Sequence, residues 1–119
     1  MSSFDPMAAA IDWLDAYRAA SVSIVDMYAP DGALECDCGG PKALHGRAAI
    51  AEYWRRRFVE MPAGELTDLQ IDNDAIVVSY LVRDETMRAM LQFDGDGKIR
   101  RSRCGPTGAG ASVERRRIT

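Results

Sequence analysis

The chain has 119 residues, and a length of this order usually folds as one domain around a single hydrophobic core. Hydrophobic residues make up 47% and charged residues 28% of the sequence, proportions that exclude a disordered or fibrous chain. Acidic residues number 18 and basic residues 15, and the net charge of −3 argues against a protein that binds nucleic acid or a membrane surface.

No segment has the pattern of a signal peptide or of a membrane helix. Residues 1–6 contain no basic group followed by an apolar run. The longest apolar runs, such as 75–80, fall well short of the roughly 20 residues that span a bilayer. The chain has three cysteines, and an odd number does not suit a disulfide scaffold. These features predict a cytoplasmic protein without a membrane partner.

The N-terminal part of the chain has helical periodicity. Apolar residues recur at spacings of three and four over 6–19, which predicts a helix with one apolar face. Asp5 followed by Pro6 is a typical helix start. A second, short helix is expected over 21–28, because Pro30 prevents its continuation.

A turn, a strand and a third helix follow. The Pro-Asp-Gly sequence at 30–32 predicts a turn, and the alternation over 33–38 predicts a short strand. From Gly46 the helical period returns with a stripe of aromatic residues, and Pro62 marks the far end of this helix.

The rest of the chain has the pattern of strands joined by tight turns. The predicted strands cover 66–72, 75–83, 86–93 and 98–104. Connections this short require neighbouring strands to run antiparallel. Helices followed by strands predict an α+β fold, with the helices gathered on one face of an antiparallel sheet.

Alternation within the strands assigns their two faces. The apolar side, which we expect to face the helices, consists of Ile76, Val78, Tyr80, Val82, Met87, Ala89, Leu91 and Phe93. The opposite side mixes apolar and polar residues, which suits partial cover by a second subunit. It carries Val77, Ser79, Leu81, Arg88, Met90, Arg101 and Arg103.

Four short motifs follow one another along the chain in an order that resembles a known family. They are Trp13-Leu-Asp-Ala-Tyr-Arg18, Ile24-Val-Asp-Met-Tyr-Ala-Pro-Asp-Gly-Ala-Leu-Glu35, Gly46-Arg-Ala-Ala-Ile-Ala-Glu-Tyr-Trp54 and Phe93-Asp-Gly-Asp-Gly-Lys-Ile99. In this order they resemble the NTF2-like superfamily, and within it the SnoaL-like and ketosteroid-isomerase-like proteins.

The resemblance implies a cone, in which a curved antiparallel sheet wraps around the N-terminal helices and leaves an apolar pocket at its open end. It also implies a homodimer formed through the outer face of the sheet. Residues 1–106 are then a single SnoaL-like domain, and 107–119 are a basic, flexible tail. The fold hosts enzymes as well as binding domains, so it does not by itself fix the function.

The residues of a ketosteroid isomerase are not preserved. Where the resemblance places the general base, the oxyanion-binding tyrosine and the protonated aspartate, this sequence has Cys36, Trp13 and Ala89. An indole N–H can donate one hydrogen bond, but the base and the second donor are missing. Steroid isomerisation by the family's mechanism is therefore not expected.

Few residues of the sequence are candidates for another catalytic role or for metal binding. Asp37 and His45 are the candidate bases of an isomerase or polyketide-cyclase-like enzyme, which is one alternative function. The spacing of Cys36, Cys38, His45 and Cys104 does not match a zinc site, because a second close pair of ligands is lacking. We expect no metal and no cofactor.

The favoured hypothesis is a domain that binds a small apolar or aromatic molecule in the cone. We expect about half of the aromatic residues to be ordinary core residues and not part of a binding site. The predicted pocket residues are Trp13, Tyr17, Cys36, Trp54, Phe58, Tyr80, Met87, Ala89, Ser102 and Cys104. The arginine runs at 55–57 and 115–117 are interpreted as solvated surface. A third hypothesis makes the domain a dimerisation or protein-interaction module that uses the outer sheet face.

Overall fold

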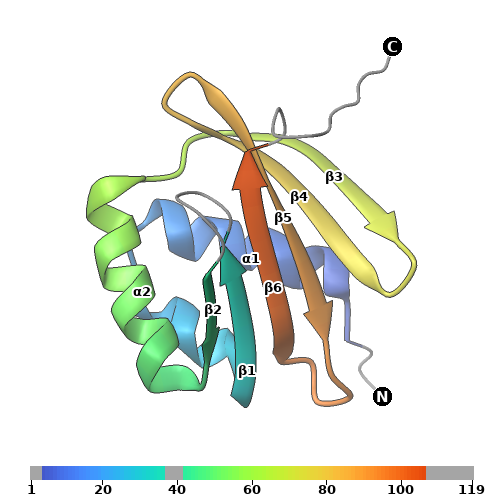
Figure 1. Ribbon diagram of the computed structural model, residues 1–119. Coiled ribbons are helices and arrows are strands. Elements are labelled where there is room, and N and C mark those ends of the chain that lie inside the picture. Colours follow the sequence, from blue (N-terminus) through green and yellow to red (C-terminus); the bar gives the residue numbers. More distant parts are fainter. Residues whose placement is uncertain (1–3, 37–41, 107–119) are drawn as a thin grey trace.

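The computed structural model describes residues 4–36 and 42–106, and these form an α+β fold (Figure 1). The elements are α1 (Pro6–Arg18), η1 (Val22–Met27), β1 (Tyr28–Cys36), β2 (Lys42–His45), α2 (Arg47–Glu60), β3 (Leu66–Asp72), β4 (Ala75–Val82), β5 (Glu85–Phe93) and β6 (Ile99–Pro106). The predicted basic tail at 107–119 lies outside the described residues.

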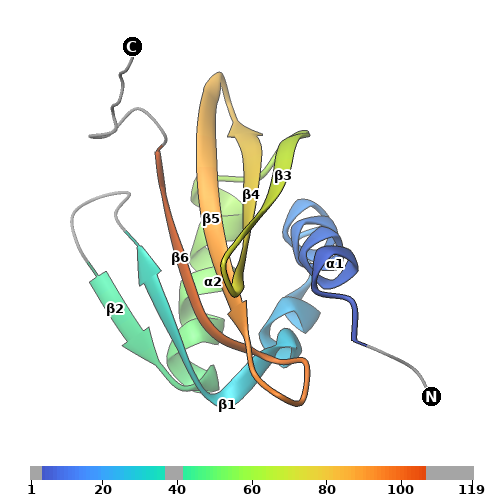
Figure 2. The same cartoon turned by 90° about the vertical axis from the view of Figure 1, so that its right-hand side faces the viewer.

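The strands form one six-stranded sheet in the order β2-β1-β6-β5-β4-β3. Neighbours are antiparallel except for β1 and β6, which run parallel. The sheet is curved and does not close, and the helices lie on its concave side (Figure 2). Helix α1 packs on β3 and β4, and α2 packs on β1 and β2. The predicted fold class is confirmed.

The first two helical segments begin at the predicted caps. Asp5 Oδ1 accepts hydrogen bonds from the backbone N–H of Met7 at 3.0 Å and of Ala8 at 3.3 Å. The Ser21 hydroxyl accepts from the N–H of Ser23 at 3.3 Å. The second segment is a single 3₁₀ helix that ends at Met27, slightly earlier than the sequence predicts.

The predicted turn at 30–32 is wrong, because these residues belong to β1. Tyr28 pairs with Ile99 of β6 and Ala33 pairs with Arg101, so the longer step on β1 forms a bulge. A bulge contains the same residue types as a turn. Here, however, the chain continues beyond it in the same strand, which pairs with a strand much later in the sequence. Local sequence therefore does not distinguish the two.

Strand β2 is the element that the sequence patterns do not predict. It pairs with β1 at the edge of the sheet, where His45 lies opposite Ala33. Four residues are too few for a clear alternation signal. The end of the predicted 33–38 strand, with Asp37 and Cys38, lies outside the described residues.

The inward-facing sides of β4 and β5 are as predicted. Seven of the eight residues assigned to the helix-facing side are buried, and Phe93 is half-buried and packs on the same core. On the outer side, where we expected partial cover by a second subunit, Ser79 is already buried within the single chain, and its register partners are Asp68 and Arg88.

The rest of the outer face is more open. Val77, Leu81 and Met90 are half-buried, whereas Arg88, Arg101 and Arg103 are exposed. Arg101 and Arg103 pair with Glu35 at 2.8 and 4.0 Å. The homodimer through this face stays a prediction. Within 4–36 and 42–106, no helix is both long and apolar enough to cross a membrane.

The bulge leads to a first prediction about Gly32. A Cβ on Gly32 would lie 3.0 Å from the carbonyl oxygen of Ile99 and 3.1 Å from that of Ala29, both held in paired backbone. We expect Gly32→Ala to lower the free energy of unfolding by about 1–3 kcal/mol, measured by urea denaturation. Gly95→Ala, whose Cβ meets nothing within 4 Å, is the control and should change it by less than about 0.5 kcal/mol. Equal effects of both changes would contradict this account of the bulge.

Candidate functional site

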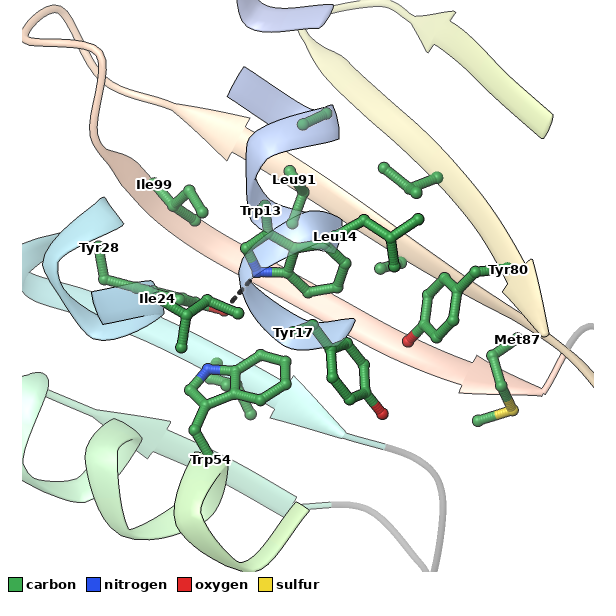
Figure 3. Packing of buried hydrophobic residues seen from close by; sticks show 14 of the residues in the cluster. Trp13, Leu14, Tyr17, Ile24, Tyr28, Trp54, Tyr80, Met87, Leu91 and Ile99 are labelled. Carbon is green, nitrogen blue, oxygen red and sulfur yellow. Dashed lines mark hydrogen bonds between the residues drawn. The ribbon is translucent and has the colours of Figure 1, made fainter. Parts of the chain in front are cut away.

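Four aromatic rings from α1, α2 and β4 pack against one another in the interior (Figure 3). The centroid of the Trp13 ring lies 5.6 Å from Trp54, 5.9 Å from Tyr17 and 6.0 Å from Tyr80. The ring of Tyr17 lies 4.8 Å from Trp54 and 5.6 Å from Tyr80. These contacts are edge-to-face, the geometry that aromatic quadrupoles favour. Each ring is at most 2% exposed, so these four predicted pocket residues, here called the ring cluster, are packed core.

A buried hydrogen-bond chain adjoins the ring cluster. The Trp13 indole donates to the Tyr28 hydroxyl at 3.4 Å, drawn as a dashed line in Figure 3. The same hydroxyl lies 2.8 Å from the Ser102 hydroxyl. Burial raises the pKa of Tyr28 to about 12, against the opposing effect of its hydrogen bond to Ser102. The hydroxyl of Ser102, a predicted pocket residue, is therefore hydrogen-bonded to another side chain of the protein.

Arg57 lies in the interior, although the arginine run at 55–57 led us to expect solvated surface. Only 5% of Arg57 is exposed. It lies on the apolar stripe of α2, one turn beyond Tyr53 and Trp54, and this helical phase turns it inward. Its neighbours Arg55 and Arg56, on the other faces of the helix, are exposed as predicted.

Among the described residues, the hydrogen-bond partners of the Arg57 guanidinium are a phenol, a thioether and a thiol. Nε donates to the Tyr17 hydroxyl at 2.8 Å, and that hydroxyl in turn donates to the carbonyl oxygen of Met61. Nη1 lies 3.4 Å from the thioether sulfur of Met61 and 3.9 Å from Cys36 Sγ. Nη2 has no hydrogen-bond partner in the part of the chain that the structure describes. Within the described residues, the Tyr17 hydroxyl is thus the one oxygen that accepts a hydrogen bond from this guanidinium.

Three tyrosines and two thiols surround this guanidinium. Its carbon lies 5.8 Å from the ring centres of Tyr17 and Tyr53, which are cation–π contacts. Cys36 on β1 and Cys104 on β6 are register partners, and the Tyr53 hydroxyl lies 3.4 and 3.5 Å from their sulfurs. We name the set Arg57, Tyr17, Tyr53, Tyr80, Cys36, Cys104 and Met61 the Arg57 cluster.

The protonation states of the Arg57 cluster follow from burial. Desolvation is the main cause that raises the pKa values of Tyr53 and Tyr80, and Cys104 raises both further. Burial lowers the pKa of Arg57, but Tyr53, Cys104 and Tyr17 more than offset this and hold it above its ordinary value. At neutral pH the cluster therefore combines neutral phenols with a charged guanidinium.

Several residues of the Arg57 cluster and its surroundings are only half-buried. Tyr53, Met61 and Cys104 are half-buried, and so is Phe58, which follows Arg57 on α2. The Phe58 ring lies 5.9 Å from Trp54 and 6.4 Å from Tyr17. These side chains connect the buried polar groups with the surface. Of the predicted pocket residues, the structure thus brings Tyr17, Cys36, Trp54, Phe58, Tyr80 and Cys104 together around Arg57.

The remaining predicted site residues lie elsewhere. Met87 and Ala89 are fully buried core residues of β5. His45 is exposed, and because the adjacent Leu44 packs on the core, alternation turns His45 to the opposite side of β2. Asp37 lies outside the described residues. Catalytic roles for Asp37 and His45 stay predictions.

The comparisons with known proteins bear on the fold. No family model matches the sequence, and no curated protein is similar to it at a significant level. Among solved structures, a SnoaL-like protein of unknown function from Burkholderia thailandensis has a TM-score of 0.74 and 16% sequence identity. The match covers 89% of this chain and 98% of that one. The chain therefore has the same fold as this SnoaL-like protein, and the fold that its motifs lead us to expect is confirmed.

The hydrogen bonds of the interior lead to a second prediction. Tyr28→Phe leaves the buried groups of Trp13 and Ser102 without their shared partner, so we expect a loss of about 1–3 kcal/mol of unfolding free energy. Tyr80→Phe is the matched control, because the Tyr80 hydroxyl has no hydrogen-bond partner within 3.5 Å among the described residues, although the nearby Arg57 opposes the rise in its pKa. It should be neutral or raise stability by up to about 1 kcal/mol. Urea denaturation measures both, and a larger loss for Tyr80→Phe would contradict the assignment.

The raised tyrosine pKa values lead to a third prediction. The folded state retains phenol protons that the unfolded chain loses near pH 10, so stability is full below that pH and falls above it. For Tyr28 the loss falls between about pH 10 and about pH 12. In an alkaline titration, tyrosinate absorbance should appear together with the loss of circular dichroism. Tyrosinate formation near pH 10 in a still-folded protein would contradict this.

Proposed function

We propose that this protein binds a small molecule with an aromatic or apolar body in the concave interior of the sheet, beside the Arg57 cluster. The observation that supports the proposal is the convergence of polar groups from α1, α2, β1, β4 and β6 inside an otherwise apolar core. A few polar groups that converge among aromatic side chains are typical of small-molecule sites. The similar structure has no established function, so this proposal depends on the site alone.

The half-buried residues suggest where such a molecule enters. Phe58 and Tyr53, both half-buried, offer ring faces to such a molecule, and Met61 has an unbranched side chain that changes rotamer at low cost. A ligand that enters beside these residues meets the Arg57 guanidinium next, because Met61 Sδ lies only 3.4 Å from Nη1.

Binding is better supported than proton-transfer catalysis. The Arg57 cluster supplies hydrogen-bond donors, and within the described residues no carboxylate or imidazole is in contact with it. An isomerase or cyclase needs a base within hydrogen-bond reach of the substrate. His45 is exposed on the opposite side of β2 from the core, and Asp37 lies outside the described residues, so both catalytic roles stay predictions.

The fourth prediction tests binding with a neutral probe. We expect 4-ethylphenol, titrated in ¹⁵N NMR experiments, to shift the indole signals of Trp13 and Trp54, the two tryptophans of the chain. Phe58→Ala should weaken binding about tenfold, because it removes a ring that contacts the ring cluster. Val59→Ala is the matched control, since Val59 is 82% exposed, and it should leave the affinity unchanged.

Two results would contradict the proposed function. One is that no neutral aromatic probe binds at millimolar concentration. The other is that binding perturbs the outer face of the sheet around Met90 and Arg101 and leaves the indole signals unchanged. Circular dichroism of Phe58→Ala separates lost binding from lost folding.

A further inference from the structure

We infer that the ligand of the Arg57 cluster carries a carboxylate, and that Arg57 is the residue that binds it. This inference rests on the proposed function and specifies the chemical class of the ligand. Its starting point is a buried guanidinium whose hydrogen-bond partners among the described residues include no carboxylate. Arg57 is 5% exposed, and Nη2 has no acceptor among the residues that the structure describes.

The contacts described for this buried guanidinium do not balance its charge. Arginine has five N–H donors, remains charged in proteins, and is stable in an interior when it is paired with an anion. The ion pairs found over 4–36 and 42–106 join Arg100 to Asp74 and Arg101 and Arg103 to Glu35, all with side chains that are partly or largely exposed. None of them involves Arg57. We assign the counter-charge, which the described residues do not supply, to a bound molecule.

The existing contacts show which part of the guanidinium is available. Nε is held by the Tyr17 hydroxyl at 2.8 Å, which fixes the orientation of the group. Nη1 faces the thioether of Met61 at 3.4 Å, and sulfur is a weak acceptor. Nη2 has no hydrogen-bond partner within 3.5 Å over 4–36 and 42–106, where its polar neighbour is the Tyr80 hydroxyl. Nη1 and Nη2 together form the edge that binds a carboxylate through two parallel hydrogen bonds.

The surroundings favour a carboxylate over a phosphate. Arg57 is the only buried cation among the described residues, so the site offers a single positive charge. The rings of Tyr17 and Tyr53 lie 5.8 Å from the guanidinium carbon, which leaves its edge for a planar partner. The phenols of Tyr53 and Tyr80 are neutral at physiological pH and do not repel an anion.

Met61 provides a way for the anion to reach the guanidinium. Its carbonyl oxygen accepts from the Tyr17 hydroxyl, whereas its half-buried side chain ends at Nη1. A rotamer change moves the sulfur away while the backbone contact stays in place. A carboxylate oxygen then replaces the sulfur with a shorter, charge-assisted hydrogen bond.

The experiment compares two probes with the same body, 4-ethylbenzoate and 4-ethylbenzamide, by isothermal titration calorimetry at neutral pH. We expect wild-type protein to bind the carboxylate at least tenfold more tightly than the amide. Arg57→Met should abolish this preference, because the thioether keeps the volume of the arginine stem and removes the charge. Arg56→Gln is the matched control, an exposed neighbour on the same helix, and should retain the preference.

A second measurement separates binding from folding. Replacing an unpaired buried charge by an apolar side chain is often neutral or stabilising, so the thermal midpoint of Arg57→Met should equal or exceed that of wild type. Addition of 4-ethylbenzoate should raise the midpoint of the wild type and not that of the variant. A variant that unfolds, or that keeps the preference for the carboxylate, would overturn the inference.

The remaining outcomes distinguish the two proposals. Equal affinity of wild type for the benzoate and the benzamide overturns the carboxylate inference and leaves the proposed function standing. Tighter binding of 4-ethylphenyl phosphate than of the benzoate overturns the choice of anion. If the protein binds neither the benzoate nor the benzamide, both the proposed binding site and the proposed ligand class are contradicted.

Discussion

The contact on which the rest of this structure depends is the edge-to-face packing of Trp13, Tyr17, Trp54 and Tyr80. These rings come from both helices and from β4, so one cluster fixes the distance between each helix and the curved sheet. Buried aromatic side chains contribute more contact area than any other residues of a small core. The position of α2 follows from this packing, and with it the inward direction of Arg57.

Arg57 and the ring cluster have opposite physical requirements. The rings exclude water, and exclusion of water strengthens any electrostatic interaction made beside them. The same exclusion makes a charge without a counter-ion unfavourable, by several kcal/mol for a fully buried ion. Tyr17 belongs to both sets, because its ring packs on Trp54 while its hydroxyl accepts from Arg57 Nε. A change in the ring cluster therefore also moves the polar site.

The sequence predicts local structure well where the signal is local. Strand β3 has the predicted limits, 66–72, because alternation and short turns specify a hairpin without reference to the rest of the chain. The parallel pairing of β1 with β6, the bulge before Ala33 and the short β2 depend on distant backbone, and no local pattern contains them. The aromatic stripe of α2 correctly indicates the interior. Arg57 was missed as an interior residue because its charge, within a run of three arginines, outweighed its place in that stripe.

The pairing of β1 with β6 has a consequence for how the chain reaches this structure. Cys36 and Cys104 are direct neighbours in the sheet although 67 residues lie between them, so a long loop closes before the two strands can meet. During synthesis the helices and β1 emerge well before β6 exists, and α2 has no completed sheet to cover. Closure of the sheet around the helices is thus the slow, late event that non-local strand pairing imposes. Because Cys104 of β6 belongs to the Arg57 cluster, the surroundings of this guanidinium are complete only when the last strand is in place.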